Sequence, residues 1–183
     1  MLLQDGATVE AGFGARPLYE ADLLVRVRDS LVNQAKTPED VVRHIDQVIP
    51  AIELPDLVVA APPKLNGAGI AAINVGARYF VMGAPIPVVP TTPVAEALRT
   101  MVVVITGPEG EQDRGKGSDV LDHPLNAVIW LSQELQRQGL SLKKGDLVSV
   151  GSFSKLLPPK AGQKITVQYQ GLPGNPVVTV NFK

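Results

Sequence analysis

The segment YEADLLVRVRD, Tyr19 to Asp29, is predicted to form a β-strand. Its middle, LLVRV, has the apolar and β-branched character that strands favour. The strand begins with Glu20 and Asp22, and because side chains alternate between the two faces of a strand, both carboxylates point the same way, about 7 Å apart. Two negative charges side by side on an apolar strand require either solvent or a cation.

The composition indicates one globular domain. A chain of 183 residues is long enough to bury a core, and 45% hydrophobic with 19% charged residues is typical of a folded protein. The absence of cysteine excludes disulfides, thiolate nucleophiles and cysteine-ligated zinc. We expect a single domain over residues 1–183, located in the cytoplasm.

The charge pattern argues against two classes of partner. The net charge is −1, and the longest basic run is Lys143-Lys144, so the electrostatic footprint of a nucleic-acid-binding protein is missing. No apolar stretch approaches the roughly 18 residues of a membrane helix. The sequence therefore predicts neither nucleic acid nor a membrane as partner.

The elements around the acidic strand are predicted to be mixed. Asp5-Gly6 between apolar residues predicts a two-residue β-hairpin at the start. Thr37 as an N-cap followed by Pro38 predicts a helix that ends at Pro50. Residues 51–59 then follow as an extended segment.

The rest of the chain is predicted to be mostly β. Residues 83–93 are rich in proline and should run extended, and 108–120 should form a hairpin loop or its flank. An apolar stripe at helical spacing predicts a helix over 122–139. Strands are expected over 70–83, 100–107, 146–152, 164–170 and 176–182. The predicted fold class is α+β, mostly β, a curled mixed-sheet roll or sandwich with two main helices.

A third carboxylate belongs with the acidic pair. Glu53 alternates outward from an otherwise apolar extended segment, and a strand–helix–strand connection can return its second strand beside the first. Three converging carboxylates repel, and a divalent cation is the usual remedy. Oxygen ligands alone favour Mg²⁺, Mn²⁺ or Ca²⁺. The alternative interpretation is a half-exposed acidic strand face with no ligand.

Three motifs in this order resemble the fumarylacetoacetate hydrolase superfamily. They are YEADLLVRV (19–27), AIELPD (51–56) and the segment from GKGSDVLDHPLNAV (115–128) to VVTVNF (177–182). The most similar branch comprises the 2-keto-4-pentenoate (2-hydroxypenta-2,4-dienoate) hydratases and 4-oxalocrotonate decarboxylases. The resemblance implies a mixed β-roll or sandwich and Mg²⁺ or Mn²⁺ held by an E-x-E pair plus a later acidic residue. These positions are Glu20, Asp22 and Glu53.

The resemblance also implies substrate contacts. Lys64 in PPKLNG and Asn74 in AAIN fall near the family's K…A-D-N segment, and Ser152 and Ser154 in VGSFS match its G-S-x-T. Each has a plainer interpretation: a solvated lysine, a turn asparagine, and hydroxyls bonded to their own backbone. No residue is assigned as catalytic.

The implied function is that of a hydratase in aromatic catabolism. Such a lyase adds water to a small 2-hydroxydienoic or 2-oxo acid through a metal-stabilised enolate. One alternative is a non-catalytic metal- or ligand-binding member of the same fold. A further alternative is a 2-oxo acid decarboxylase or C–C hydrolase of the superfamily. The family often forms larger assemblies, so we expect a homo-oligomer.

Three positions depart from the family pattern. Asp22 replaces the usual second glutamate, Ile73 stands where the family has an aspartate, and Lys155 replaces a glycine. In addition, the hydratases carry an N-terminal region with a lysine near the substrate, and this chain begins after it. The departures favour the non-catalytic alternative.

Overall fold

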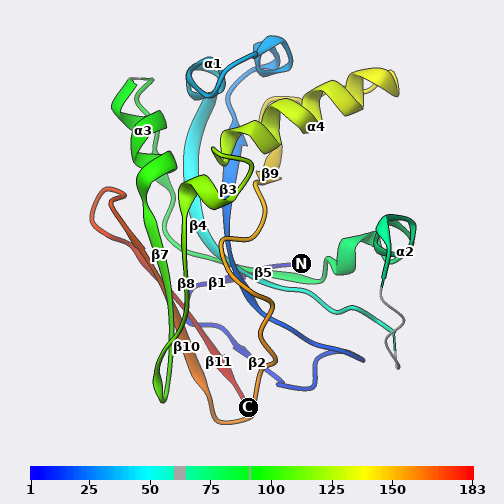
Figure 1. The fold of residues 1–183 in the computed structure, drawn as a ribbon, viewed down its shortest axis with the longest axis vertical. Helices are drawn as coiled ribbons and strands as arrows, with labels where there is room; N and C mark the ends of the chain where they lie inside the picture. The colour runs from blue at the N-terminus through cyan, green and yellow to red at the C-terminus, as the bar shows by residue number, and fades with distance from the viewer. Residues whose placement is uncertain (60–64, 91) are drawn as a thin grey trace.

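The computed structural model describes residues 1–59, 65–90 and 92–183, and its strands form two sheets (Figure 1). Sheet A has the order β1-β5-β4-β3-β9, with β6 also paired to β4, and sheet B has the order β2-β11-β10-β7-β8. The strands of sheet A are β1 (Leu2–Gln4), β3 (Glu20–Val27), β4 (Ile45–Leu54), β5 (Tyr79–Met82), β6 (Ile86–Pro87) and β9 (Leu147–Ser149). Those of sheet B are β2 (Thr8–Val9), β7 (Val102–Gly107), β8 (Gly110–Lys116), β10 (Lys164–Gln170) and β11 (Val177–Phe182).

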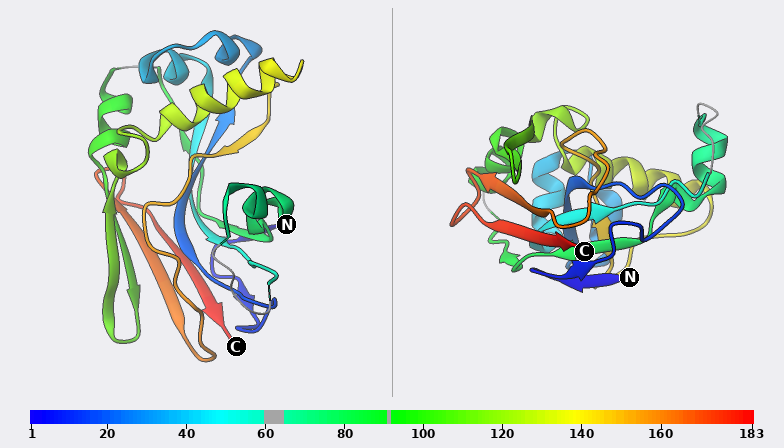
Figure 2. Two further views of the ribbon diagram at one scale, coloured as in Figure 1. Left: turned by 45° about the vertical axis from the view of Figure 1, so that its right-hand side comes forward. Right: turned by 90° about the horizontal axis from the view of Figure 1, so that it is seen from below.

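The helices cover one end of the sheets. Figure 1 shows α1 (Pro38–Arg43), α3 (Thr92–Thr100) and α4 (Leu125–Arg137) together at that end, whereas α2 (Gly67–Ala72) lies apart, beside the N-terminus in Figure 2. Short 3₁₀ turns are η1 (Ser30–Gln34), η2 (Asn74–Gly76) and η3 (Gly117–Asp119). No helix in the described part of the chain is long and apolar enough to cross a membrane.

The two faces of the β3–β4 pair differ: one packs in the main core and the other carries the acidic residues. The pairing is antiparallel, with Glu20 opposite Glu53 and Asp22 opposite Ala51. One face of β3, which carries Leu23, belongs to the main core together with side chains of sheet B. The other face carries the two acidic residues and then Leu24, which belongs to a small separate apolar cluster. The acidic pair is therefore directed away from the core that joins the sheets.

The structure confirms the predicted fold class and several of its elements. The helix expected over 122–139 is α4, and the strand expected over 100–107 is β7. The last three predicted strands are present as β9, β10 and β11. The segment 108–120 forms the β7–β8 hairpin, of which most is strand β8.

The helix predicted from Thr37 to Pro50 is wrong in its second half. Thr37 and Asp40 do form the expected capping box, but α1 ends at Arg43 and β4 begins at Ile45. Pairing with β3 offers the apolar residues of this segment more buried partners than a short surface helix would. Pro50 lies inside β4, where its carbonyl still accepts a hydrogen bond from the Gly83 N–H.

The hairpin predicted at Asp5-Gly6 does not form. Gly6 has the expected left-handed φ of 82°, but the two strands that it joins pair in different sheets. Strand β1 pairs in parallel with β5, and β2 pairs in parallel with β11. The turn chemistry was therefore correct, while the partners were decided by long-range contacts.

The strand predicted over 70–83 is reduced to four residues near its end. The Asn66 side chain accepts a hydrogen bond from the Gly69 N–H and caps α2, and η2 follows directly. Only β5, from Tyr79 to Met82, is extended. An apolar run of this length does not distinguish helix from strand, and the local cap was the missed signal.

Gly115 on β8 allows a close approach between sheet B and the loop after β9. A Cβ atom at this position would lie 1.8 Å from the carbonyl oxygen of Phe153. Phe153 in turn donates its N–H to the Ala21 carbonyl, at the start of β3. The glycine thus permits the contact through which β8, the 151–155 loop and the acidic strand are packed together.

We expect Gly115→Ala to lower the free energy of unfolding by about 2 kcal/mol or more, because the backbone of the loop must move to admit the methyl group. Chemical denaturation measures the change. Gly12→Ala is the matched control, since a methyl group added there would have no other atom within 4 Å, and it should change the same quantity by less than about 0.5 kcal/mol. Equal effects of the two substitutions would contradict this account.

Candidate metal and substrate site

Glu20 and Glu53 face each other across the β3–β4 ladder. They are direct register partners, so their side chains leave the same face of sheet A. The carboxyl groups of Glu20 and Asp22 lie near enough to Glu53 to raise its pKa. The register therefore places Glu20, Asp22 and Glu53 on one face of the β3–β4 pair.

Asp22 is completely buried, and its carboxylate accepts hydrogen bonds from β9, from the loop after β9 and from the next residue of β3. Its Oδ2 accepts a hydrogen bond from Ser149 Oγ at 2.5 Å, and its Oδ1 accepts from the N–H groups of Leu23 at 2.6 Å and Gly151 at 3.2 Å. Gly151 has a φ of 103°, which only glycine adopts readily. Asp22 is consequently fixed in one orientation by residues of β9 and the loop after it.

Burial raises the pKa of all three carboxyl groups. It raises the pKa of Asp22 to about 7, against the opposing effect of the hydrogen bond from Ser149. It raises the pKa of Glu53 to about 9, with further increases from the charges of Asp22 and Glu20. The pKa of Glu20 is raised by burial and lowered in part by the Ser152 hydroxyl. Without a counter-charge, the cluster therefore retains protons.

The cluster fits a divalent cation in its donor chemistry. It supplies only carboxylate oxygens, which suit Mg²⁺, Mn²⁺ and Ca²⁺, and its excess negative charge is what such an ion neutralises. Within the described ranges, however, no three acidic or histidine side chains are already arranged around a common point. Because Asp22 is turned towards Ser149 and Gly151, the two glutamates are the groups that are freer to move onto an ion.

Ser152 and Ser154 lie next to the acidic cluster. Ser152 donates its hydroxyl hydrogen to the Ser154 carbonyl at 2.8 Å, and it lies near enough to Glu20 to lower the pKa of that carboxyl group in part. The Ser154 hydroxyl accepts from the Ala21 N–H at 3.0 Å. Ser154 thus fastens the loop to β3, whereas Ser152 is the one whose hydroxyl reaches a carboxylate of the cluster.

The structure does not place the remaining residues predicted to contact substrate beside the carboxylate cluster. Asn74 begins η2, is exposed and has a left-handed φ of 52°, which fits the plainer interpretation of a turn residue. Lys64 lies outside the described residues. Ile73 is half-buried at the end of α2. The exposed Lys155 donates its backbone N–H to Asp113 at 2.7 Å, which keeps the loop close to β8.

Tyr169 is a site neighbour that the sequence did not single out. It lies on β10 of the other sheet, is fully buried, and places its hydroxyl 2.6 Å from the Asp22 carbonyl and 2.5 Å from the Ala51 carbonyl. The same hydroxyl accepts from the Ala51 N–H at 3.2 Å. One side chain of sheet B therefore holds both acidic strands. Nothing in the local pattern of β10 distinguished this tyrosine from an ordinary core residue.

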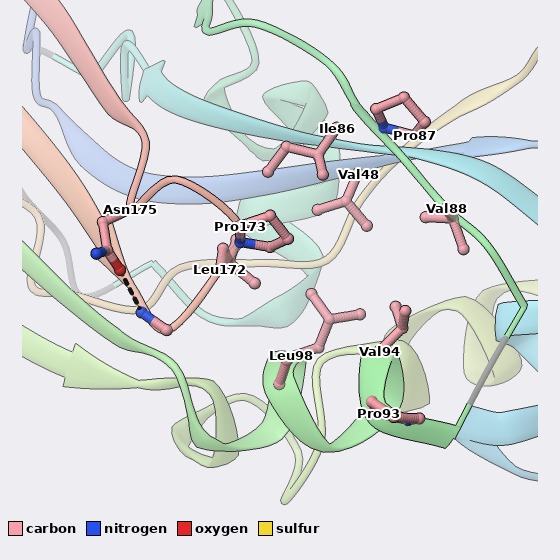
Figure 3. Close-up of a pocket in the computed structure, with 12 residues that line it drawn as sticks. Val48, Ile86, Pro87, Val88, Pro93, Val94, Leu98, Leu172, Pro173 and Asn175 are labelled. Carbon is pink, nitrogen blue, oxygen red and sulfur yellow. Dashed lines mark hydrogen bonds between the residues drawn. The ribbon is translucent and has the colours of Figure 1, made fainter.

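A large apolar pocket lies elsewhere. It has a volume of about 420 Å³ and is enclosed by residues of α3, β6 and the β10–β11 turn, among them Leu98, Ile86 and Leu172 (Figure 3). Val48 of β4 also lines it, and Val48 belongs to the main core on the face of β4 opposite to Glu53. The pocket is therefore separate from the carboxylate cluster.

Comparison with known proteins finds relatives among the hydratases and decarboxylases of small keto acids. No family model matches the chain. It is 27% identical over 179 residues to 2-keto-4-pentenoate hydratase 2 of Dechloromonas aromatica, which corresponds to 94% of this chain and 64% of that protein. The chain thus spans a little less than two thirds of the length of this relative.

Solved structures share the fold. The 4-oxalocrotonate decarboxylase of Pseudomonas putida G7, complexed with magnesium and adipate, is 27% identical with a TM-score of 0.85, over 100% of this chain and 66% of that one. A putative fumarylacetoacetate hydrolase family protein of Yersinia pestis CO92 has a TM-score of 0.66 at 17% identity, over 100% of this chain and 80% of that one.

For the metal-free protein we expect the free energy of unfolding to fall as the pH rises from about 5 to about 9. In this range the unfolded Glu53 has lost its proton while the folded one retains it, so each pH unit favours unfolding, by at most about 1.4 kcal/mol for one proton. Denaturation in a chelating buffer across this range measures the slope. Glu53→Gln should flatten it, and an unchanged slope in that variant would contradict the assignment.

Proposed function

We propose that this chain, a homologue of the 2-keto-4-pentenoate hydratases and 4-oxalocrotonate decarboxylases with the fold of the fumarylacetoacetate hydrolase family, is a divalent-metal-dependent hydratase. Its substrate is a small 2-hydroxydienoic or 2-oxo acid, to which it adds water in a catabolic route for aromatic compounds. The single observation that carries the proposal is the register of β3 and β4, which brings Glu20, Asp22 and Glu53 together on one face.

Glu20 and Glu53 would hold the cation, Mg²⁺ or Mn²⁺, with Asp22 supporting them as the third acidic residue. The ion would supply Lewis-acid stabilisation of the negative charge that develops on the 2-oxo oxygen. Binding requires Glu53 to lose the proton that burial favours, so cation binding and proton release are coupled at this position. Asp22 is kept in place meanwhile by Ser149 and Gly151.

Ser152 has the position to orient the substrate. Its hydroxyl contacts Glu20 while it bonds the Ser154 carbonyl, so it lies at the edge of the carboxylate cluster and on a loop tied to β3. A hydroxyl here can donate to a substrate carboxylate or accept from an attacking water. The chain's contribution is then to fix the acid end of the substrate, while the loop limits access of bulk water.

A second candidate function is binding without turnover. It is favoured by Ile73, an apolar side chain where the resemblance implies an aspartate, and by Asn74, which is exposed in a turn. An isoleucine at position 73 has no side-chain group to form the polar contact that the aspartate implied by the resemblance would form. The decarboxylase alternative has the support of a 27% identical structure.

Turnover of 2-hydroxypenta-2,4-dienoate with Mg²⁺ or Mn²⁺ is the direct test, and the loss of the dienol absorbance measures it. A hydratase converts this compound to the 4-hydroxy-2-oxo acid without releasing CO₂. Metal binding without turnover above background would leave the binding function, and CO₂ release from a 2-oxo dicarboxylic acid would identify a decarboxylase. We expect the chain purified as a homo-oligomer to be the active form.

Cation binding can be tested independently of catalysis. A ligand that binds only the folded state raises the melting temperature, so saturating Mg²⁺ should raise it in the unmodified protein. We expect Glu20→Ala and Glu53→Gln each to reduce this shift by more than half, because each removes one anionic ligand. Glu109→Ala, an exposed acidic residue in the β7–β8 turn, is the control and should retain the full shift. An equal shift in all three variants would refute the site.

A further inference from the structure

The apolar pocket between α3, β6 and the β10–β11 turn has an inner wall made of core side chains. Four of the residues that line it are buried members of the main core: Val48, Val88, Leu98 and Leu172. The pocket has a volume of about 420 Å³, within the range of roughly 300–1,000 Å³ that is usual for sites of small molecules. It is therefore a hollow that reaches the core and not a shallow groove on the surface.

Figure 3 shows how three parts of the chain surround this space. Ile86 and Val48 lie on one side, Leu98 and Val94 lie on the opposite side, and Leu172 stands between them at one end. Three exposed proline residues also line the pocket: Pro87, Pro93 and Pro173. Proline has a fixed φ and no N–H, so the outer edge of the pocket is stiff and offers few hydrogen-bond donors.

Polar groups in the β6 and turn walls are already bonded within the protein. Val88 donates its N–H to the Asp46 carbonyl at 3.0 Å, and its own carbonyl accepts from Arg28 at 3.0 Å. The Gly171 N–H donates to Asn175 Oδ1 at 2.9 Å (Figure 3), and the side-chain nitrogen of Asn175 is directed away from the pocket. A polar group placed in the pocket would lose its hydration without gaining a partner in these walls.

The pocket also lacks charge. None of the described residues that line it is acidic, basic or a histidine. Positions 89–92, which join β6 to α3, are Val-Pro-Thr-Thr and add no charge. The charged residues of α3, Glu96 and Arg99, bind each other at 2.9 and 3.0 Å and do not line the pocket. An ion bound here would have no counter-charge among the lining residues, and a peptide segment would bring backbone polar groups that need partners.

We infer that this pocket binds a small, neutral molecule of hydrocarbon character, such as an alkyl-substituted aromatic ring. Apolar cavities in proteins stay dry and take up molecules such as benzene. Val48 belongs to the main core on the face of β4 opposite to Glu53, so the site is separate from the carboxylate cluster and does not rest on the proposed function. The ligand would contact α3 and both sheets, and its binding would stabilise the folded state.

Methyl NMR spectra of the whole chain, recorded while one of four compounds is added, test the inference: toluene, ethylbenzene, benzyl alcohol and benzoate. We expect toluene and ethylbenzene to shift the methyl signals of Val48, Ile86 and Leu98 until the site is saturated. The extra methylene group of ethylbenzene should strengthen binding by up to about fourfold. Benzyl alcohol is similar in size to ethylbenzene, but burial of its hydroxyl without a partner should weaken binding by about tenfold or more. Benzoate should produce no saturable shift.

The variant Ala97→Leu tests whether binding takes place in this pocket. Ala97 is a half-buried residue of α3 that lines it, so a leucine side chain there would occupy the space of the ligand. We expect this variant to lose saturable binding of ethylbenzene. Ala71→Leu is the matched control, because Ala71 is exposed on α2, and it should leave the affinity unchanged. Circular dichroism measures whether each variant is folded, and Val94→Phe makes the same test one turn earlier in α3 if Ala97→Leu does not fold.

Several results would overturn the inference. Toluene and ethylbenzene could produce no saturable shift up to their limits of solubility, or folded Ala97→Leu could bind ethylbenzene as the unmodified chain does. Binding of benzyl alcohol or benzoate as tight as that of ethylbenzene would show that the pocket accepts polar molecules. If hydrocarbon binding is absent and Ala97→Leu changes the oligomeric state measured by sedimentation, the pocket is instead a contact between copies of the chain.

Discussion

The antiparallel pairing of β3 with β4 is the constraint on which the rest of the structure depends. Its register places Glu20 opposite Glu53 and Asp22 opposite Ala51. Because a one-residue slip exchanges the two faces of a strand, the same register decides which side chains enter the core and which form the site. The Tyr169 hydroxyl, which reaches both strands from the other sheet, acts at this register position. The same register therefore specifies both the core and the candidate site.

Three carboxyl groups close together repel one another when they are charged. The chain reduces this repulsion by hydrogen bonds to Asp22 and by a raised pKa that keeps Glu53 protonated. Asp22 receives hydrogen bonds from Ser149 and from two backbone N–H groups, which favour its charged form. Glu53 has no such donors among the described residues, and its raised pKa follows from burial and from its acidic neighbours. The asymmetry divides the cluster into Asp22, which is held by hydrogen bonds, and Glu53, whose carboxyl group keeps its proton to higher pH. Under the proposed function, Glu53 is the residue that would give up a proton when a cation binds.

The shared face of Glu20, Asp22 and Glu53 was predictable because it depends on alternation within strands and on a connection that returns β4 beside β3. This held even though α1 is shorter than predicted, and the metal-ligand role of the three residues stays a prediction. Ser152 was assigned through the family resemblance and lies beside Glu20. Ser149 was not, because a serine in a strand carries no local sign of its partner, which here is 127 residues away along the chain.

The sequence by itself determined the fold class, the helix α4, the C-terminal strands and the shared face of Glu20 and Asp22 on β3. These properties depend on composition, on periodicity and on residues close together in the chain. Only the tertiary structure decided that β1 and β2 pair in different sheets, that Ile45 to Leu54 is a strand, and that Tyr169 of sheet B contacts both acidic strands. The physical reason is that strand partners are chosen by burial and by hydrogen bonds between segments far apart in sequence. Local propensity does not encode these contacts.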